Sequence, residues 1–204
     1  ANRPTSEPAL PRVIHGFAFQ PYQKDQDAIA GEDPTSAQID ADLKLLAGTT
    51  RAVRTYSSIG TLGQIPALAR KHGLKVMLGS WIDSDRERND REVEAAIRLA
   101  NTNRNVTRIL VGNEVVLRGD LPVEDLIAHL DRVRAATKQP VSTAEPWHVW
   151  IKHPELVAHV DFITVHMLPY WEGVEVEAAV GYVVAKLGEV RSAFPGKPIV
   201  IGEV

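Results

Sequence analysis

Short apolar runs alternate with longer amphipathic segments along most of the chain. Seven runs rich in valine and isoleucine predict strands at residues 13–19, 52–57, 75–81, 108–115, 141–145, 162–166 and 198–203. The runs are almost continuously apolar instead of alternating with polar residues. This pattern is typical of parallel strands whose two faces are both covered.

Between these runs, apolar residues recur three and four positions apart. Ile39, Leu43 and Leu46 precede Gly48, and a similar series follows Pro122 at residues 126–133. Each series predicts a helix with one buried stripe. The strand starts recur about every thirty residues, the length of one βα unit, which leaves a doubly wound sheet or a closed eight-stranded barrel as candidates.

Polar or aromatic residues end at least five of the predicted strands, at 19–20, 54–57, 113–114, 145–147, 166–171 and 203. In a barrel all these ends meet at one rim, whereas an open sheet concentrates function at one switch point, usually beside a glycine-rich turn. No such turn occurs in the sequence. We therefore predict an α/β fold of the (β/α)₈ TIM-barrel type. Residues 13–204 would hold about seven βα units, truncated after the seventh strand, and residues 1–12 would form an N-terminal extension.

The composition narrows the range of partners. The 204 residues carry a net charge of −3 with both signs interspersed, so we expect no nucleic-acid partner. No run approaches the roughly 18 to 20 apolar residues of a membrane span, so we expect no direct insertion of this segment into a membrane. Cysteine is absent, which excludes disulfides and a cysteine nucleophile. A balanced surface suits a neutral ligand.

Two glutamates carry the candidate chemistry. Glu114 follows Asn113 after the fourth predicted strand, and Glu203 ends the seventh. On a barrel rim they would face each other across the central cavity. Cleavage of a glycosidic bond needs one carboxyl group to protonate the leaving oxygen and another to attack the anomeric carbon or activate water, so no metal or other cofactor is expected. For either glutamate alone, a salt bridge or a helix cap is the alternative.

Other residues at the strand ends are candidate substrate contacts or partners of the two glutamates. Arg54 within a strand is costly unless it meets a carboxylate, so it is a candidate partner of Glu203, with a purely structural ion pair as the alternative. Trp147 and Trp171 are candidate platforms for sugar rings, with burial in the core as the alternative. The further candidates are Phe19, Gln20, Tyr56, Asn113, Glu145 and Tyr170.

His166 admits two interpretations. It could hydrogen-bond to substrate or to Glu203, or it could bind a metal together with His15 and Glu203. No HxH or HExxH pattern accompanies it, which favours the hydrogen bond.

Five motifs follow one another in the chain: VRTY at 53–56, VGNEV at 111–115, VSTAEPW at 141–147, HMLPYWEG at 166–173 and IGEV at 201–204. In this order they resemble glycoside hydrolase family 17, in particular its bacterial β-1,3-glucanase and glucanosyltransferase branch. The resemblance implies Glu114 as acid/base, Glu203 as nucleophile, retention of anomeric configuration and a β-glucan substrate. It also implies a periplasmic or extracytoplasmic location, with the segment excised from a larger membrane-anchored protein. The family pattern continues after the nucleophile with Gly-Trp-Pro-Ser and an eighth strand, which this sequence does not contain.

Two other functions remain open from the residues. One is a glucan-binding barrel fragment without activity. The other is a metal-dependent sugar-processing barrel enzyme built around His15, His166 and Glu203.

Overall fold

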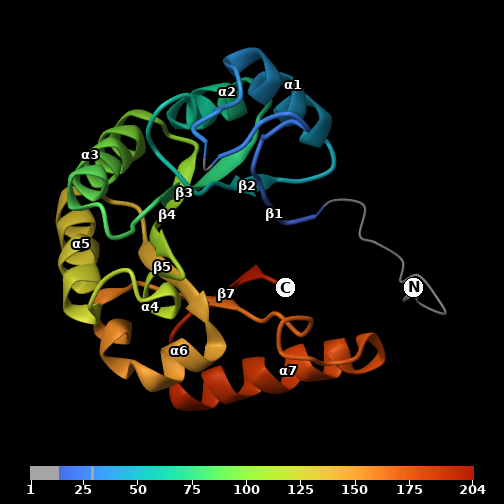
Figure 1. Ribbon diagram of the computed structural model, residues 1–204, viewed down its shortest axis with the longest axis vertical. Coiled ribbons are helices and arrows are strands. Elements are labelled where there is room, and N and C mark those ends of the chain that lie inside the picture. Colours follow the sequence, from blue (N-terminus) through green and yellow to red (C-terminus); the bar gives the residue numbers. More distant parts are fainter. Residues whose placement is uncertain (1–13, 29) are drawn as a thin grey trace.

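Seven parallel strands form a single sheet in the computed structural model, which describes residues 14–28 and 30–204. Their spatial order is their order in the chain: β1 (Phe17–Ala18), β2 (Ala52–Arg54), β3 (Lys75–Ser80), β4 (Val106–Asn113), β5 (Val141–Pro146), β6 (Ile163–His166) and β7 (Ile199–Glu203). Figure 1 shows the strands curving into an inner wall with the helices outside it. The predicted fold class is confirmed as a nearly closed (β/α) barrel. The predicted extension at 1–12 lies outside the described residues.

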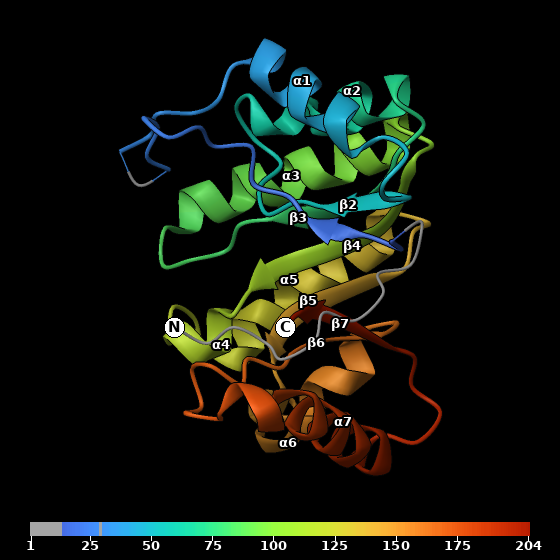
Figure 2. The ribbon, with the colours of Figure 1, turned by 90° about the vertical axis from the view of Figure 1, so that its right-hand side faces the viewer.

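Helices connect successive strands and cover the outer face of the sheet. They are α1 (Ser36–Leu46), α2 (Ile65–Lys71), α3 (Arg86–Thr102), α4 (Val115–Arg118), α5 (Val123–Ala136), α6 (Trp147–Lys152) and α7 (Val176–Ala193), with short 3₁₀ helices at Leu62–Gln64 and Pro154–His159. Figure 2 shows α1 and α2 on one side of the strands and α6 and α7 on the other. None of the helices in the described residues is both long and apolar enough to cross a bilayer.

Local sequence explains where the two longest connecting helices before β4 begin. Thr35 caps α1 by accepting the backbone N–H of Gln38, whose side chain in turn accepts the N–H of Thr35. Asp85 caps α3 by accepting the N–H of Arg88. Such caps satisfy backbone donors that have no partner within the helix, and each contributes about 1 kcal/mol.

The main core lies between the sheet and the helices. The stripe of Ile39 and Leu43 on α1 is fully buried, as predicted. Ile109 and Val111 of β4 pack in the same cluster, whereas Leu110 belongs to a smaller one. Because side chains alternate along a strand, Leu110 lies on the opposite, inner face of the barrel. The outer layer thus supplies most of the stabilising apolar burial, and the inner face is left for polar residues near the strand ends.

The limits of some strands differ from the prediction, and one of these differences lies at Glu114. The predicted strand 108–115 ends two residues earlier, at Asn113, because Glu114 adopts a left-handed conformation with φ 57° and ψ 32°. The first strand, predicted at 13–19, is reduced to Phe17–Ala18 within the described residues, and Val13 lies outside them. Before this strand, Ile14 forms an isolated bridge with Thr50.

Candidate active site

Glu114 stands where β4 turns sharply into α4. Its backbone N–H donates to the carbonyl of Ala144 at 2.7 Å, so the residue is still tied to β5 although the strand has ended. Its carboxylate Oε1 lies 2.7 Å from Nδ1 of His166. The turn therefore directs the carboxylate over the end of the sheet, toward β6.

Glu203 ends β7, and the preceding Gly202 allows it to come close to β6. A Cβ at position 202 would lie 2.8 Å from Cγ2 of Thr164 and 2.9 Å from Cδ2 of His166. Contacts that short do not occur without displacement of a neighbour. Glycine is thus required by the close approach of the two strands, which places Glu203 beside the His166 ring.

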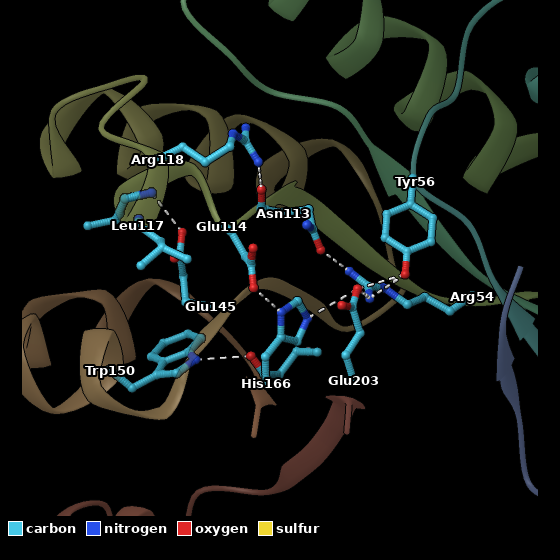
Figure 3. A network of polar contacts seen from close by, with 12 residues as sticks. Arg54, Tyr56, Asn113, Glu114, Leu117, Arg118, Glu145, Trp150, His166 and Glu203 are labelled. Atoms are coloured by element: carbon cyan, nitrogen blue, oxygen red, sulfur yellow. Dashed lines mark hydrogen bonds and ion pairs between the residues drawn. The ribbon is translucent and has the colours of Figure 1, made fainter. Parts of the chain in front are cut away.

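His166 lies between the two glutamates, as Figure 3 shows. Its side chain is fully buried, and its Nε2 is 3.7 Å from Oε1 of Glu203. The nearest ligand atoms of Glu114, His166 and Glu203 all lie within 4.8 Å of one another. A retaining glycosidase needs its two carboxyl groups about 5 to 5.5 Å apart. The structure therefore brings the two predicted carboxyl groups close together on either side of His166.

Glu203 is surrounded by donors from β2 and the residues that follow it. The Nη1 atom of Arg54 lies 2.5 Å from Oε1 of Glu203, and the hydroxyl of Tyr56 donates to the same oxygen at 2.7 Å. Burial by itself raises the pKa of Glu203, but the charge of His166, the Tyr56 hydroxyl and the Arg54 guanidinium outweigh it, so the pKa is lowered below its ordinary value. This carboxyl group is therefore kept ionised.

Arg54 also links the donors to the end of β4. Its Nη2 donates to Oδ1 of Asn113, and its guanidinium lies 4.2 Å from the centre of the Tyr56 ring. Burial raises the pKa of Tyr56 well above its ordinary value, in spite of the Arg54 charge, so its hydroxyl stays protonated and donates to Glu203. Arg54, Tyr56 and Asn113, all predicted site residues, thus form one network with the nucleophile candidate.

Glu145 has a different place from the one predicted. Its side chain is fully buried and accepts the backbone N–H groups of Val116 at 2.9 Å and Leu117 at 3.3 Å. A carboxylate that is closed off beneath α4 cannot reach a sugar. The structure therefore corrects the predicted substrate contact by Glu145, because the side chain turns toward the first turn of α4 instead of the open rim.

The two predicted tryptophan platforms have different environments. Trp171 is 78% exposed, packs edge-to-face against the exposed Tyr170, and lines a cavity of about 320 Å³ with Glu114 and His166. Trp147 is partly buried: its Nε1 donates to Glu172 at 2.9 Å, and Nζ of Lys186 lies 3.9 Å from the centre of its ring. Lys186 of α7 thus lies over the Trp147 ring where a sugar would stack, and the platform role of Trp147 stays a prediction.

A second cavity of about 620 Å³ opens beside Tyr56, and it is lined by the predicted residues Phe19 and Gln20 together with Trp81. Phe19 is nearly buried and supplies an apolar wall, whereas the Gln20 side chain is exposed. One cavity thus lies beside Glu114, and another lies beside Tyr56, whose hydroxyl contacts Glu203.

The cluster of Glu114, His166 and Glu203 has the donor atoms of a metal site, although His15 is not part of it. A divalent cation there would lie close to the Arg54 guanidinium, which already pairs with Glu203 at 2.5 Å. Repulsion between the two cations disfavours that use of the cluster.

Comparison with known proteins shows the family of the chain. Residues 16–204 match the sequence model of the BtgE/BtgC glycoside hydrolase domain. The chain belongs to this family. It is 33% identical over 147 residues to a glucan 1,3-beta-glucosidase of Schizosaccharomyces pombe, a match that covers 65% of this chain and 46% of that protein. It is 26% identical over 156 residues to a glucan 1,3-beta-glucosidase of Arthroderma benhamiae, covering 73% and 50%. The chain thus spans half the length or less of these relatives.

Solved structures extend the family relationship. The glycoside hydrolase family 17 beta-1,3-glucanosyltransferase of Rhizomucor miehei superposes with a TM-score of 0.77 and 28% identity, covering 92% of this chain and 70% of that one. An active-site mutant of the R. miehei beta-1,3-glucanosyltransferase, in complex with laminaritriose, gives a TM-score of 0.78 at the same identity and coverage. The resemblance to family 17 drawn from the five motifs is confirmed, while the bacterial branch stays a prediction.

Within this BtgE/BtgC-type domain, two rim residues were missed by the sequence analysis. Trp81 follows β3 directly, lines the cavity beside Tyr56, and is held by Asp83 at 3.0 Å and by Arg118 at 4.5 Å from its ring centre. His148 lines the other cavity. Trp81 obeys the rule that selected the other candidates, since it is an aromatic residue at a strand end. No motif or spacing in the sequence singles out His148, because the direction of its side chain depends on the short helix α6.

Proposed function

We propose that this domain is a retaining enzyme acting on β-1,3-glucan, with Glu203 as nucleophile and Glu114 as acid/base. The observation that carries the proposal is the pair of carboxylates that meet at His166, of which only Glu203 is paired with a guanidinium and a tyrosine hydroxyl. That asymmetry favours an ionised nucleophile at Glu203 and leaves Glu114 as the group that donates and accepts the proton.

The reaction takes place in two displacements. A carboxylate oxygen of Glu203 attacks the anomeric carbon as the glycosidic bond breaks, and Glu114 gives its proton to the departing oxygen. Glu114, now ionised, then takes a proton from an incoming hydroxyl, which attacks the same carbon and releases Glu203. If the hydroxyl belongs to water, the result is hydrolysis, and if it belongs to another glucan, the result is transfer.

The two cavities fit the two halves of a glucan chain. Because the acid/base contacts the departing oxygen, we assign the cavity beside Glu114, with the exposed Trp171, to the leaving and acceptor sugars. The cavity beside Tyr56, with Phe19 and Trp81, would hold the donor sugars. The names of the relatives and the laminaritriose in the R. miehei complex support a β-1,3-linked substrate. An extracytoplasmic location stays a prediction.

The test uses laminari-oligosaccharides and three proteins. The wild type should convert them, and NMR of the first products should show the β configuration. Glu203→Ala should abolish conversion, and Glu114→Ala should keep activity only toward donors with an activated leaving group, with added azide captured as the β-glycosyl azide. Undiminished activity of Glu203→Ala would refute the mechanism. Binding without products by the folded wild type would indicate a glucan-binding domain, and loss of activity with a chelator would indicate the metal-dependent alternative.

A further inference from the structure

The backbone of Glu114 is strained. Among residues 14–28 and 30–204 it alone, apart from glycines, has a positive φ, at 57°. For a residue with a Cβ, the left-handed region is unfavourable, and such a conformation persists only where its surroundings hold it. The groups that hold this turn therefore determine where the Glu114 carboxylate lies.

Two adjacent residues at the end of β5 hold the turn from both sides. The carbonyl of Ala144 accepts the N–H of Glu114 itself at 2.7 Å. The carboxylate of Glu145 accepts the N–H groups of Val116 at 2.9 Å and Leu117 at 3.3 Å, which are two of the first donors of α4 and have no partner within the helix. Figure 3 shows Glu145 turned toward the backbone of Leu117, away from Glu203. Hydrogen bonds to β5 thus hold the turn at the N–H of Glu114 and again at the N–H groups of Val116 and Leu117.

We propose that Glu145 is a positioning residue for the acid/base: its buried carboxylate fixes the β4–α4 turn in the left-handed conformation that directs Glu114 at His166 and at the departing oxygen. This inference rests on the proposed role of Glu114. Loss of the Glu145 contacts would let the turn relax toward an ordinary φ and move the Glu114 carboxylate away from His166.

The electrostatics of Glu145 show that its ionised form depends on the hydrogen bonds at this turn. Burial raises its pKa to about 7, the N–H groups of Val116 and Leu117 act in the opposite direction, the charge of Glu114 raises it further, and Arg118 lowers it. A buried carboxylate without substrate access is unfavourable by itself. Its two backbone hydrogen bonds at the turn are the compensation that the structure shows.

The experiment separates positioning of the acid from general damage by means of the leaving group. An oligosaccharide leaving group must be protonated as it departs, whereas a 2,4-dinitrophenolate does not need a proton. We therefore compare kcat/KM for laminaripentaose and for 2,4-dinitrophenyl β-laminaribioside in the wild type, Glu145→Gln and Glu145→Asp. Both substrates are measured on the same preparation, so the ratio does not depend on the fraction that is folded.

For Glu145→Gln we expect kcat/KM to fall about 10- to 100-fold on laminaripentaose and less than about 3-fold on the aryl glycoside, since general acid catalysis contributes about 10²- to 10⁴-fold. Glu145→Asp, which keeps the charge but is one methylene shorter, should lie between the wild type and Glu145→Gln. Should Glu145→Gln fail to fold, the Glu145→Asp ratio decides. Equal losses on both substrates, or no loss on either, would overturn the inference.

Glu92 supplies a matched control. It is also a fully buried glutamate whose carboxylate accepts a rim-loop N–H, that of Ser58 at 2.7 Å, but none of its hydrogen bonds involves the β4–α4 turn. Glu92→Gln should leave the ratio between the two substrates unchanged, whatever it does to stability. Glu114→Ala should change the ratio more than Glu145→Gln does. If Glu114→Ala does not change the ratio at all, the proposed function fails, and not only the role of Glu145.

Discussion

Arg54 provides the sharpest test of how the proposed nucleophile, Glu203, is kept ionised. Its guanidinium is buried, lies 2.5 Å from Glu203 and also contacts Tyr56 and Asn113. Replacing it with methionine keeps a long apolar side chain but removes the cation. Glu203 would then keep only the Tyr56 hydroxyl and the neighbouring His166 as favourable partners, and burial would raise its pKa.

The size of the effect follows from the charge separation. Two unit charges about 4 Å apart at an effective dielectric constant of about 20 attract each other by about 4 kcal/mol. The Glu203 side chain is 28% exposed, so we expect water to screen about half of this, leaving roughly 2 kcal/mol. Since one pKa unit corresponds to about 1.4 kcal/mol, the acidic limb of kcat/KM should move up by about 1 to 2 pH units.

The assay is kcat/KM on laminaripentaose between pH 3 and pH 8, because this parameter reports ionisations of the free enzyme. Arg54→Lys keeps the charge, so the acidic limb of its pH profile should stay close to that of the wild type. Its activity should still fall, because a lysine cannot hold Glu203 and Asn113 together. Arg86→Met is the control, since Arg86 pairs with Asp125 at the surface and is 80% exposed. A loss in Arg54→Met by the same factor at every pH would refute the electrostatic reasoning.

The same pairing predicts a pH dependence of stability. The pKa of Glu203 in the folded protein is below its ordinary value of 4.5, so this stabilisation is present above pH 4.5 and is lost as the pH falls through the folded-state pKa. The destabilisation of Arg54→Met in urea should therefore be larger at pH 7 than at pH 3. An equal destabilisation at pH 7 and pH 3 would contradict the stabilising pairing of Arg54 with ionised Glu203.

Further predictions follow from the two cavities, from the close approach of β7 to β6 and from the buried carboxylate. Gly202→Ala should lower kcat at least 10-fold and the free energy of unfolding by about 1 to 3 kcal/mol, measured by kinetics and urea denaturation, because its Cβ would lie 2.8 Å from Thr164. Trp171→Ala should lower the ratio of transfer to hydrolysis products, whereas Trp81→Ala should raise KM for the donor; the reverse pattern would exchange the cavity assignments. Because burial raises the pKa of Glu145 to about 7, the wild type should lose stability relative to Glu145→Gln as the pH rises from about 4.5 to about 7. Urea denaturation should show a loss of at most roughly 3 kcal/mol. A stability difference between the two proteins that stays constant over this pH range would contradict the raised pKa.

The barrel itself could be predicted from local pattern. Continuous apolar runs spaced by helical stripes are sufficient for parallel strands with helices outside, because each face of the sheet must be covered by something apolar. The position of Glu114 and Glu203 at strand ends then places both on one rim, since all parallel strands end on the same side. The order of the motifs further identified the family. For these features the residue and its neighbours in the chain carry enough information.

The direction of individual side chains at the rim depended on the tertiary structure. Glu145 and Trp147 each follow an apolar run, as Glu114 does, yet Glu145 turns beneath α4 and Trp147 packs against α7. Glu145 still lies within β5 and points to the opposite face from Ala144, which packs with Leu110. Trp147 follows the strand, where alternation no longer specifies a face and the next turn decides which way a side chain points. The left-handed φ of Glu114 is such a turn, and it depends on contacts from β5, about thirty residues later in the chain. Local sequence thus determined which residues reach the rim, and only packing between distant segments decided which of them face the open side of the rim.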